Sequence, residues 1–107
     1  MSGWTVKAHP LAEVELKALA ADVCARFLHI AELLETFGPQ KVGMPHIRPL
    51  EGKLWEMRMR GKDGIARAVY AAVHGRTLLV LHVFTKKTQT TPRAAIETAR
   101  KRLEAMK

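Results

Sequence analysis

Three consecutive β-strand patterns between residues 54 and 87 constrain the fold more than any other part of the sequence. In residues 54–60, Trp55, Met57 and Met59 alternate with a second set that holds Glu56, Arg58 and Arg60, as expected of a strand with two different faces. Residues 65–73 and 78–84 are mostly apolar, and the only Lys or Arg among them is Arg67. Glycine-containing turns at residues 61–64 and 74–76 separate the three segments, which predicts an antiparallel meander.

Helical patterns flank this meander. Residues 11–37 contain neither Gly nor Pro, but one straight helix of this length would be roughly 40 Å long, more than a domain of this size can accommodate. The apolar positions also change register near residues 19–22, so the sequence predicts two helices with a bend near Ala20–Asp22. Further along, Thr91 as the N-cap and Pro92 as the first helical residue predict a last helix.

A short strand at residues 4–7 completes the predicted order β-α-α-β-β-β-α. We therefore expect a single α+β domain over residues 1–107, with a twisted, mainly antiparallel sheet on which the helical hairpin and the C-terminal helix pack. The helices are expected on one face, so that the other face stays open and carries polar side chains. Residues 38–53 are rich in Gly and Pro and are expected to form a connecting loop.

Positive charge is concentrated in the second half of the chain. The formal net charge is +8. Residues 1–47 hold four Lys or Arg and five Asp or Glu, whereas residues 48–107 hold 14 Lys or Arg and five Asp or Glu. A small domain with one basic half is typical of proteins that bind a polyanion, most commonly nucleic acid. The alternatives are a solvated surface kept soluble by its charge and a basic face that docks an acidic protein.

Several other classes of protein are disfavoured by the sequence. No apolar run approaches the roughly 20 residues of a membrane span, and the first ten residues do not resemble a signal peptide. A lone cysteine, Cys24, excludes an intrachain disulfide and a cysteine-based zinc site. The histidines of the chain are scattered and do not suggest a metal-binding set, and the sequence contains no nucleotide-binding loop or hydrolase motif. We expect a cytoplasmic protein that uses neither a metal nor a cofactor and does not bind membranes.

Two arginines of the meander form the strongest candidate site. The turn at residues 61–64 pairs positions whose numbers sum to about 125, which puts Arg58 opposite or nearly opposite Arg67. Two like charges in this arrangement destabilise a sheet, whereas an anion bound between them would offset the repulsion. Guanidinium groups bind phosphate bidentately and stabilise the charge of a phosphoryl transition state. The alternative is that each arginine pairs with Glu51, Glu56 or solvent.

Lys86, Lys87 and His82 are further candidates. The two lysines follow the third strand of the meander, where they could contact phosphate or transfer a proton. A solvated pair that protects the strand end is the alternative. His82 lies within the apolar third strand and is a candidate general acid or base. A hydrogen-bonded structural histidine is the more ordinary explanation for its position.

Two blocks of sequence carry a family resemblance: LEGKLWEMR at residues 50–58 and FTKKTQTTP at residues 84–92. They resemble the phage-derived Gp49-like, HigB-related branch of the RelE/ParE toxin superfamily, and the resemblance extends over nearly the whole chain. It implies a RelE-like fold and the toxin of a type II toxin–antitoxin system. It also implies a cognate antitoxin, often one with a helix-turn-helix domain. Many such relatives are endoribonucleases that cut mRNA on the ribosome without a metal.

The resemblance implies roles for individual residues. Arg58 and Arg67 match basic positions of the family and Lys87 falls near a third, with Lys86 beside it, so Arg58, Arg67 and Lys87 are expected to be catalytic. As further cations of the basic half, Arg60, Lys86, Lys53 and Arg48 are expected to bind RNA. The last helix lacks the tyrosine or histidine that RelE-type enzymes often carry, so the general base stays open between His82 and a lysine. ParE-like relatives inhibit DNA gyrase without nuclease residues. The alternative function is therefore a gyrase inhibitor or another phage-derived protein that binds a partner.

Overall fold

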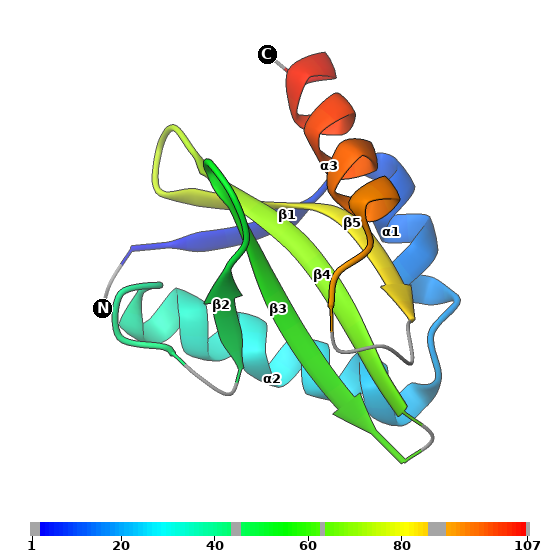
Figure 1. Cartoon of the computed structure of the whole chain (residues 1–107). Helices are drawn as coiled ribbons and strands as arrows, with labels where there is room; N and C mark the ends of the chain where they lie inside the picture. The colour runs from blue at the N-terminus through cyan, green and yellow to red at the C-terminus, as the bar shows by residue number, and fades with distance from the viewer. Residues whose placement is uncertain (1–2, 44–45, 63, 86–89, 107) are drawn as a thin grey trace.

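The computed structural model describes residues 3–43, 46–62, 64–85 and 90–106. A five-stranded sheet with the strand order β1-β5-β4-β3-β2 forms its centre (Figure 1). β1 runs parallel to β5, and the other neighbours are antiparallel. The elements in chain order are β1 (Thr5–Ala8), α1 (Pro10–Lys17), α2 (Ala21–Phe37), β2 (Ile47–Pro49), β3 (Leu54–Gly61), β4 (Gly64–Val73), β5 (Thr77–Thr85) and α3 (Arg93–Ala105). The predicted α+β order is confirmed, with β2 as an additional short strand inside the expected loop.

The register of the meander is the one that the sequence predicts. Arg58 pairs directly with Arg67, and Gly61 pairs with Gly64 across the turn. A Cβ atom at Gly61 would lie 2.5 Å from Cγ2 of Val23, so glycine is what lets this turn approach the start of α2 so closely. There the backbone N–H of Lys62 donates a hydrogen bond of 2.6 Å to Asp22, which ties the end of β3 to α2.

The helical hairpin is also confirmed. α1 ends at Lys17 and α2 begins at Ala21, so the break lies immediately before and at the start of the predicted bend. Asp22 lies in the first turn of α2, where a negative charge interacts favourably with the helix dipole. Gly38 ends α2 with a φ of 84°, a conformation that glycine adopts at low cost. None of the described helices is long and apolar enough to cross a membrane.

Helices cover both faces of the sheet, so the expectation of helices on one face only is wrong. α1 and α2 cover one face, where Met57, Met59 and Tyr70 belong to the larger apolar core. On the other face Leu54, Val69 and Leu81 pack with Ile96 and Ala99 of α3. Figure 1 shows α2 behind the sheet and α3 in front of it. Because α3 contacts only β4 and β5 substantially, no helix of the described chain covers the part of this second face over β2 and β3.

The start of α3 differs from the prediction by one residue, and the difference has a physical cause. The N-cap is Pro92, in an extended conformation, and the helix begins at Arg93. Thr91 does not cap the helix, because its side chain is buried and donates a hydrogen bond to Glu56 on β3. A tertiary contact has therefore replaced the local one.

Candidate functional site

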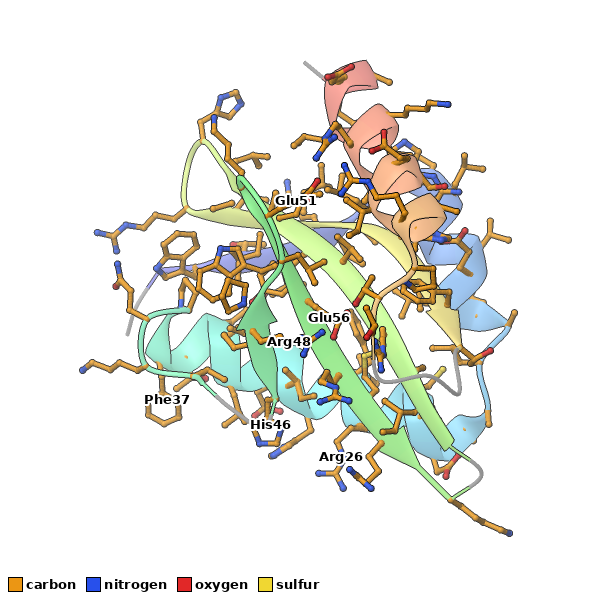
Figure 2. All side chains as sticks on the ribbon, in the orientation of Figure 1. Arg26, Phe37, His46, Arg48, Glu51 and Glu56 are labelled. Carbon is orange, nitrogen blue, oxygen red and sulfur yellow. The ribbon has the colours of Figure 1, made fainter. Side chains whose placement is uncertain are left out.

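A buried carboxylate, that of Glu56, lies at the centre of a cluster of arginines on the α3 side of the sheet. Its side chain is fully buried. Arg48 of β2 places Nε 3.4 Å from Oε1 of Glu56, and Arg58 of β3 places Nε 4.0 Å from the same oxygen. Arg67 of β4 places Nη1 3.8 Å from Oε2. We call these three residues around Glu56 the arginine cluster (Figure 2, where Arg48 and Glu56 are labelled).

The alternation of the strands explains why these side chains meet. Glu56 and Arg58 lie two residues apart on β3 and so point to the same face. Arg48 pairs with Glu56 in the β2–β3 register, and Arg67 pairs with Arg58 in the β3–β4 register. Directly paired residues share a face of the sheet. Three guanidinium groups therefore surround one carboxylate, and two positive charges of the cluster are not compensated within it.

Thr91 connects the arginine cluster to α3. Its hydroxyl group donates to Oε2 of Glu56 and accepts a hydrogen bond of 3.3 Å from Nη1 of Arg67. Thr91 and Arg67 are both almost fully buried. These contacts hold the carboxylate and one guanidinium in fixed positions at the point where the chain enters the last helix.

The three arginines differ in how far they reach the surface. The side chain of Arg67 is 1% exposed, that of Arg58 22% and that of Arg48 33%. Burial lowers the pKa of Arg67, Glu56 opposes this shift, and Arg58 and Arg48 add to it. Arginine nevertheless stays protonated in proteins. Arg67 therefore supplies a buried positive charge beneath the surface, whereas Arg58 and Arg48 can contact a ligand directly.

The other predicted RNA-binding residues lie around this cluster or outside the described part of the chain. Arg60 is exposed on β3, two residues beyond Arg58 and on the same face. Lys53 is exposed in the turn that precedes β3. Lys86 and Lys87 lie outside the described residues. The structure thus brings together Arg48, Arg58 and Arg67, and Arg60 extends their surface.

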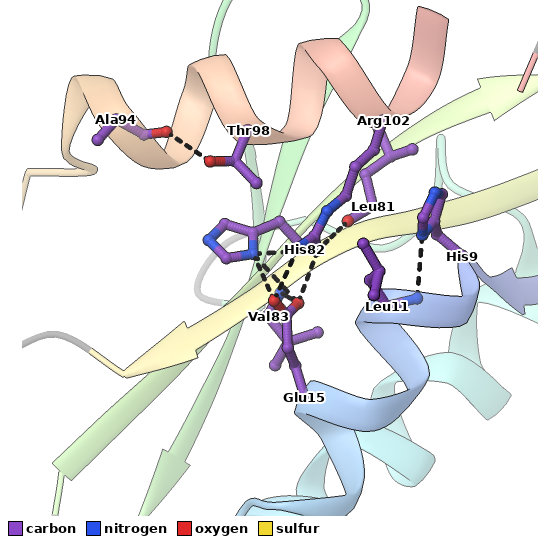
Figure 3. A network of polar contacts seen from close by, with 9 residues as sticks. All are labelled: His9, Leu11, Glu15, Leu81, His82, Val83, Ala94, Thr98 and Arg102. Atoms are coloured by element: carbon purple, nitrogen blue, oxygen red, sulfur yellow. Dashed lines mark hydrogen bonds and ion pairs between the residues drawn. The ribbon is translucent and has the colours of Figure 1, made fainter. Parts of the chain in front are cut away.

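His82 belongs to a separate network, which joins α1, β5 and α3 (Figure 3). The carboxylate of Glu15 accepts hydrogen bonds from both terminal nitrogens of Arg102, at 2.9 and 3.1 Å. It also accepts from the backbone N–H of Val83 at 2.9 Å, and Nδ1 of His82 lies 3.1 Å from each carboxylate oxygen. Within the described residues His82 makes no hydrogen bond or ion pair with the arginine cluster. This network holds His82 between two helices.

The electrostatics of Glu15 fit a structural ion pair. Partial burial acts to raise its pKa, but the hydrogen bonds from Arg102, Val83 and His82 outweigh it and leave the pKa below its usual value. The carboxylate therefore stays charged at neutral pH. The carboxylate of Glu15 also protects an edge of the sheet. β1 pairs with β5 only as far as Val80, so the backbone N–H of Val83 would face outward without a partner if it did not donate to Glu15.

Two members of the site were not assigned from the sequence. The sequence offers Glu56 only as an alternative partner of the arginines on the Arg58 face, and the structure shows this pairing for both Arg58 and Arg67. Thr91 was assigned to a helix cap, and nothing local in the sequence indicates its contact with a residue 35 positions away. Among the described residues, no three His, Cys, Asp or Glu side chains gather in a way that could hold a metal ion.

Comparison with protein families gives one match over most of the chain. The family described as "Phage derived protein Gp49-like (DUF891)" matches residues 14–104. No curated protein matches the sequence. The family match includes the whole arginine cluster, Thr91 and the Glu15 network.

Solved structures of two toxins share the fold. One comes from the archaeal RelE–RelB complex of Pyrococcus horikoshii OT3; it is 22% identical, with a TM-score of 0.64 over 82% of this chain and 99% of that chain. The other is a mutant of the E. coli toxin RelE in the free state; it is 15% identical, with a TM-score of 0.67 over 94% of this chain and 98% of that chain. The predicted RelE-like fold is thereby confirmed.

Proposed function

This chain belongs to the phage-derived Gp49-like family, and we propose that it is the toxin of a type II toxin–antitoxin system that cleaves mRNA on the ribosome. The observation that carries the proposal is the arginine cluster, in which three guanidinium groups from adjacent strands share one carboxylate. Such an arrangement holds an excess of positive charge on a rigid support, which is what binding of a phosphodiester requires. The similarity of the fold to that of RelE toxins also supports this proposal.

The exposed fractions of the arginines suggest a division of roles. Arg58 and Arg48 are exposed enough to donate hydrogen bonds to the non-bridging oxygens of the scissile phosphate. Arg67 is almost fully buried, so it acts on the phosphate through its charge and not by direct contact. Its charge strengthens the positive potential, and its contacts with Glu56 and Thr91 fix the geometry of the cluster. On the basis of the family resemblance Lys87 is assigned to catalysis, and Arg60, Lys53 and Lys86 are assigned to RNA binding as further cations of the basic half of the chain.

The chemistry that fits this set of residues is attack of the ribose 2′-hydroxyl group on the adjacent phosphate. The P–O2′ bond forms as the P–O5′ bond to the next nucleotide breaks, which gives a 2′,3′-cyclic phosphate and a 5′-hydroxyl group, and the proton lost from the 2′-hydroxyl is balanced by the one that the leaving 5′-oxygen gains. The transition state carries more negative charge on the phosphate oxygens than the substrate does, so fixed guanidinium groups stabilise it preferentially. The residue that removes the 2′-hydroxyl proton is not assigned within the described part of the chain. His82 stays a candidate, but Glu15 and Arg102 contact its Nδ1 atom in a separate network, and among the described residues it makes no hydrogen bond or ion pair with the arginine cluster.

An antitoxin is the proposed protein partner. The archaeal structural neighbour comes from a complex of RelE with RelB, and a toxin of this class needs an inhibitor to be tolerated by its host. We propose a co-encoded antitoxin, with a helix-turn-helix domain as the family resemblance implies. Both proteins would act in the cytoplasm, where the ribosomes are.

Induced expression in bacteria tests the proposal. Wild-type protein should arrest growth and produce codon-linked cuts in mRNA, detected by primer extension. Arg58→Ala should abolish both, because it removes a partly exposed guanidinium at the centre of the cluster. Lys7→Ala is the matched control, since it removes one charge from β1 at the opposite edge of the sheet. Intact mRNA during growth arrest would exclude the nuclease, and loss of DNA supercoiling in the same cells would favour the gyrase inhibitor.

A further inference from the structure

A second cationic site adjoins the arginine cluster at the outer part of the sheet. A groove of about 220 Å³ is lined by Arg26 of α2, His46, Arg58 and Arg60 of β3, and Ile65 of β4. Figure 2 shows Arg26 and His46 near one another in the lower part of the view. Arg58 belongs to both sites, so the groove and the cluster form one continuous surface.

None of the described residues that line the groove is an Asp or Glu, so they supply no counter-charge of their own. Within the described residues, the side chains of Arg26, His46 and Arg60 make no hydrogen bond or ion pair, whereas Arg93, Arg100 and Arg102 of α3 are all paired with carboxylates. The arginines of α3 thus have carboxylate partners, whereas Arg26 and Arg60 at this groove have none within the described residues, and Arg58 shares Glu56 with two other arginines. Cations that converge without a carboxylate create a positive electrostatic potential, which attracts an anion.

The composition of the groove narrows the class of anion. Guanidinium groups arriving from a helix and from a strand fit the several oxygens of a phosphate better than a single point charge does. Ile65 adds an apolar side chain against which a sugar or base can pack. A bound anion here would lie next to a second anion at Arg58. Two adjacent anion positions on one surface match a polymer with repeated phosphates.

We propose that this groove is a phosphate-binding subsite that takes a phosphodiester neighbouring the one held at the arginine cluster, on the same single-stranded nucleic acid. The identity of the polyanion rests on the proposed function. The groove itself is a separate feature, since it depends on Arg26 and His46, which lie outside the arginine cluster. It extends the nucleic-acid surface around the edge of the sheet onto α2.

Binding of unreactive oligonucleotides tests the subsite. Single-stranded oligodeoxynucleotides lack the 2′-hydroxyl group and cannot be cut, so fluorescence anisotropy measures binding alone. Arg26→Ala should weaken binding of a nine-nucleotide strand several-fold and leave a dinucleotide, which has a single phosphodiester for the arginine cluster, unaffected. The slope of log affinity against log salt should fall in magnitude by about 0.7, the value for one phosphate contact on a single strand. The substitution keeps α2 intact, because Arg26 is exposed and alanine is a strong helix former.

Matched variants separate the outcomes. Arg26→Lys keeps the charge but loses the bidentate donors, so it should keep the salt dependence and recover only part of the affinity. Lys7→Ala removes a charge at the far edge of the sheet and should change nothing. If Arg26→Ala has no effect while Arg58→Ala weakens binding, the subsite is wrong and the proposed function stands. Equal losses for Arg26→Ala and Lys7→Ala would also overturn the subsite, because net charge alone would explain them. Absence of binding by the wild-type protein would overturn the subsite, whereas the proposed function is decided separately by the mRNA cuts in the expression experiment.

Discussion

Two buried or half-buried carboxylates organise the charges of this protein, and they do so in opposite ways. Glu15 is bound by one guanidinium group, one backbone N–H and one imidazole, so its charge is balanced by a single arginine, Arg102. Glu56 lies among three guanidinium groups and is fully buried. The first arrangement closes an edge of the sheet and joins two helices to it. The second leaves a positive surface that an anion can complete.

This contrast shows how a structural ion pair can be distinguished from a binding site when both contain arginine and glutamate. A balanced pair is satisfied by the fold alone. An unbalanced cluster carries repulsion that the folded protein tolerates because a ligand relieves it, and stability is often sacrificed in this way at functional sites. The ratio of cations to carboxylates is therefore more informative here than the presence of arginines.

Removal of the carboxylate at the centre of the cluster should have the largest effect. Glu56→Ala leaves Arg67 buried without its counter-charge and exposes three guanidinium groups to mutual repulsion. We expect a loss of about 3–5 kcal/mol in the free energy of unfolding, measured by urea denaturation. The double variant Glu56→Ala, Arg67→Met should recover part of the loss, because no buried charge would then remain at that position.

Glu97→Ala is the control for this prediction. The side chain of Glu97 is 42% exposed and pairs with Arg93 and Arg100 on α3. Exposed ion pairs contribute at most about 1 kcal/mol, so its removal should cost much less than removal of Glu56. Equal losses for the two variants would mean that Glu56 does not compensate the buried charge of Arg67.

The sequence was sufficient where local geometry decides the outcome. The glycine-containing turn after β3 sets the register of the meander, and the register alone makes Arg58 face Arg67. The change in apolar register near residues 19–22 was enough to divide the helical segment in two. These features depend on a few neighbouring residues, so a pattern along the chain can reveal them.

The sequence was not sufficient where distant segments meet. Thr91 fits a helix cap by local rules, but a contact with Glu56 across the fold takes its hydroxyl group. Arg26 looks like one more exposed helical charge until α2 packs behind β3 and brings it next to Arg58. The placement of α3 on the second face also follows from tertiary packing, because its apolar stripe would suit either face.

The balanced carboxylate should show its role in the pH dependence of stability. Glu15→Gln should lower the free energy of unfolding by about 1–3 kcal/mol at pH 7, since the hydrogen bonds from Arg102, His82 and Val83 lose a charged acceptor. The folded-state pKa of Glu15 lies below its unfolded value. The stabilisation is therefore fully present above the unfolded pKa of about 4.3 and is lost as the pH falls through the folded pKa.

Urea denaturation between pH 7 and pH 3 measures this effect. The difference between wild type and Glu15→Gln should be constant above about pH 5, where the carboxyl group is ionised in both states, and shrink below it. Glu104→Gln is the control, because Glu104 is exposed and makes no ion pair within the described residues. A difference that persists unchanged at pH 3 would contradict a role for the charge of Glu15. Oligonucleotide affinity at pH 7 should be the same for all three proteins.

The smallest effect is expected for a compensated arginine on the same half of the molecule. Arg93 pairs with Glu51 at 2.7 Å and with Glu97 at 3.1 Å, and it is well exposed. Arg93→Ala removes the same charge as Arg58→Ala, but its two carboxylates already cancel the field that a phosphate would feel. We therefore expect little change in stability and no change in oligonucleotide affinity or in its salt dependence. If Arg93→Ala weakens binding as much as Arg58→Ala, net charge rather than the unbalanced cluster attracts the nucleic acid.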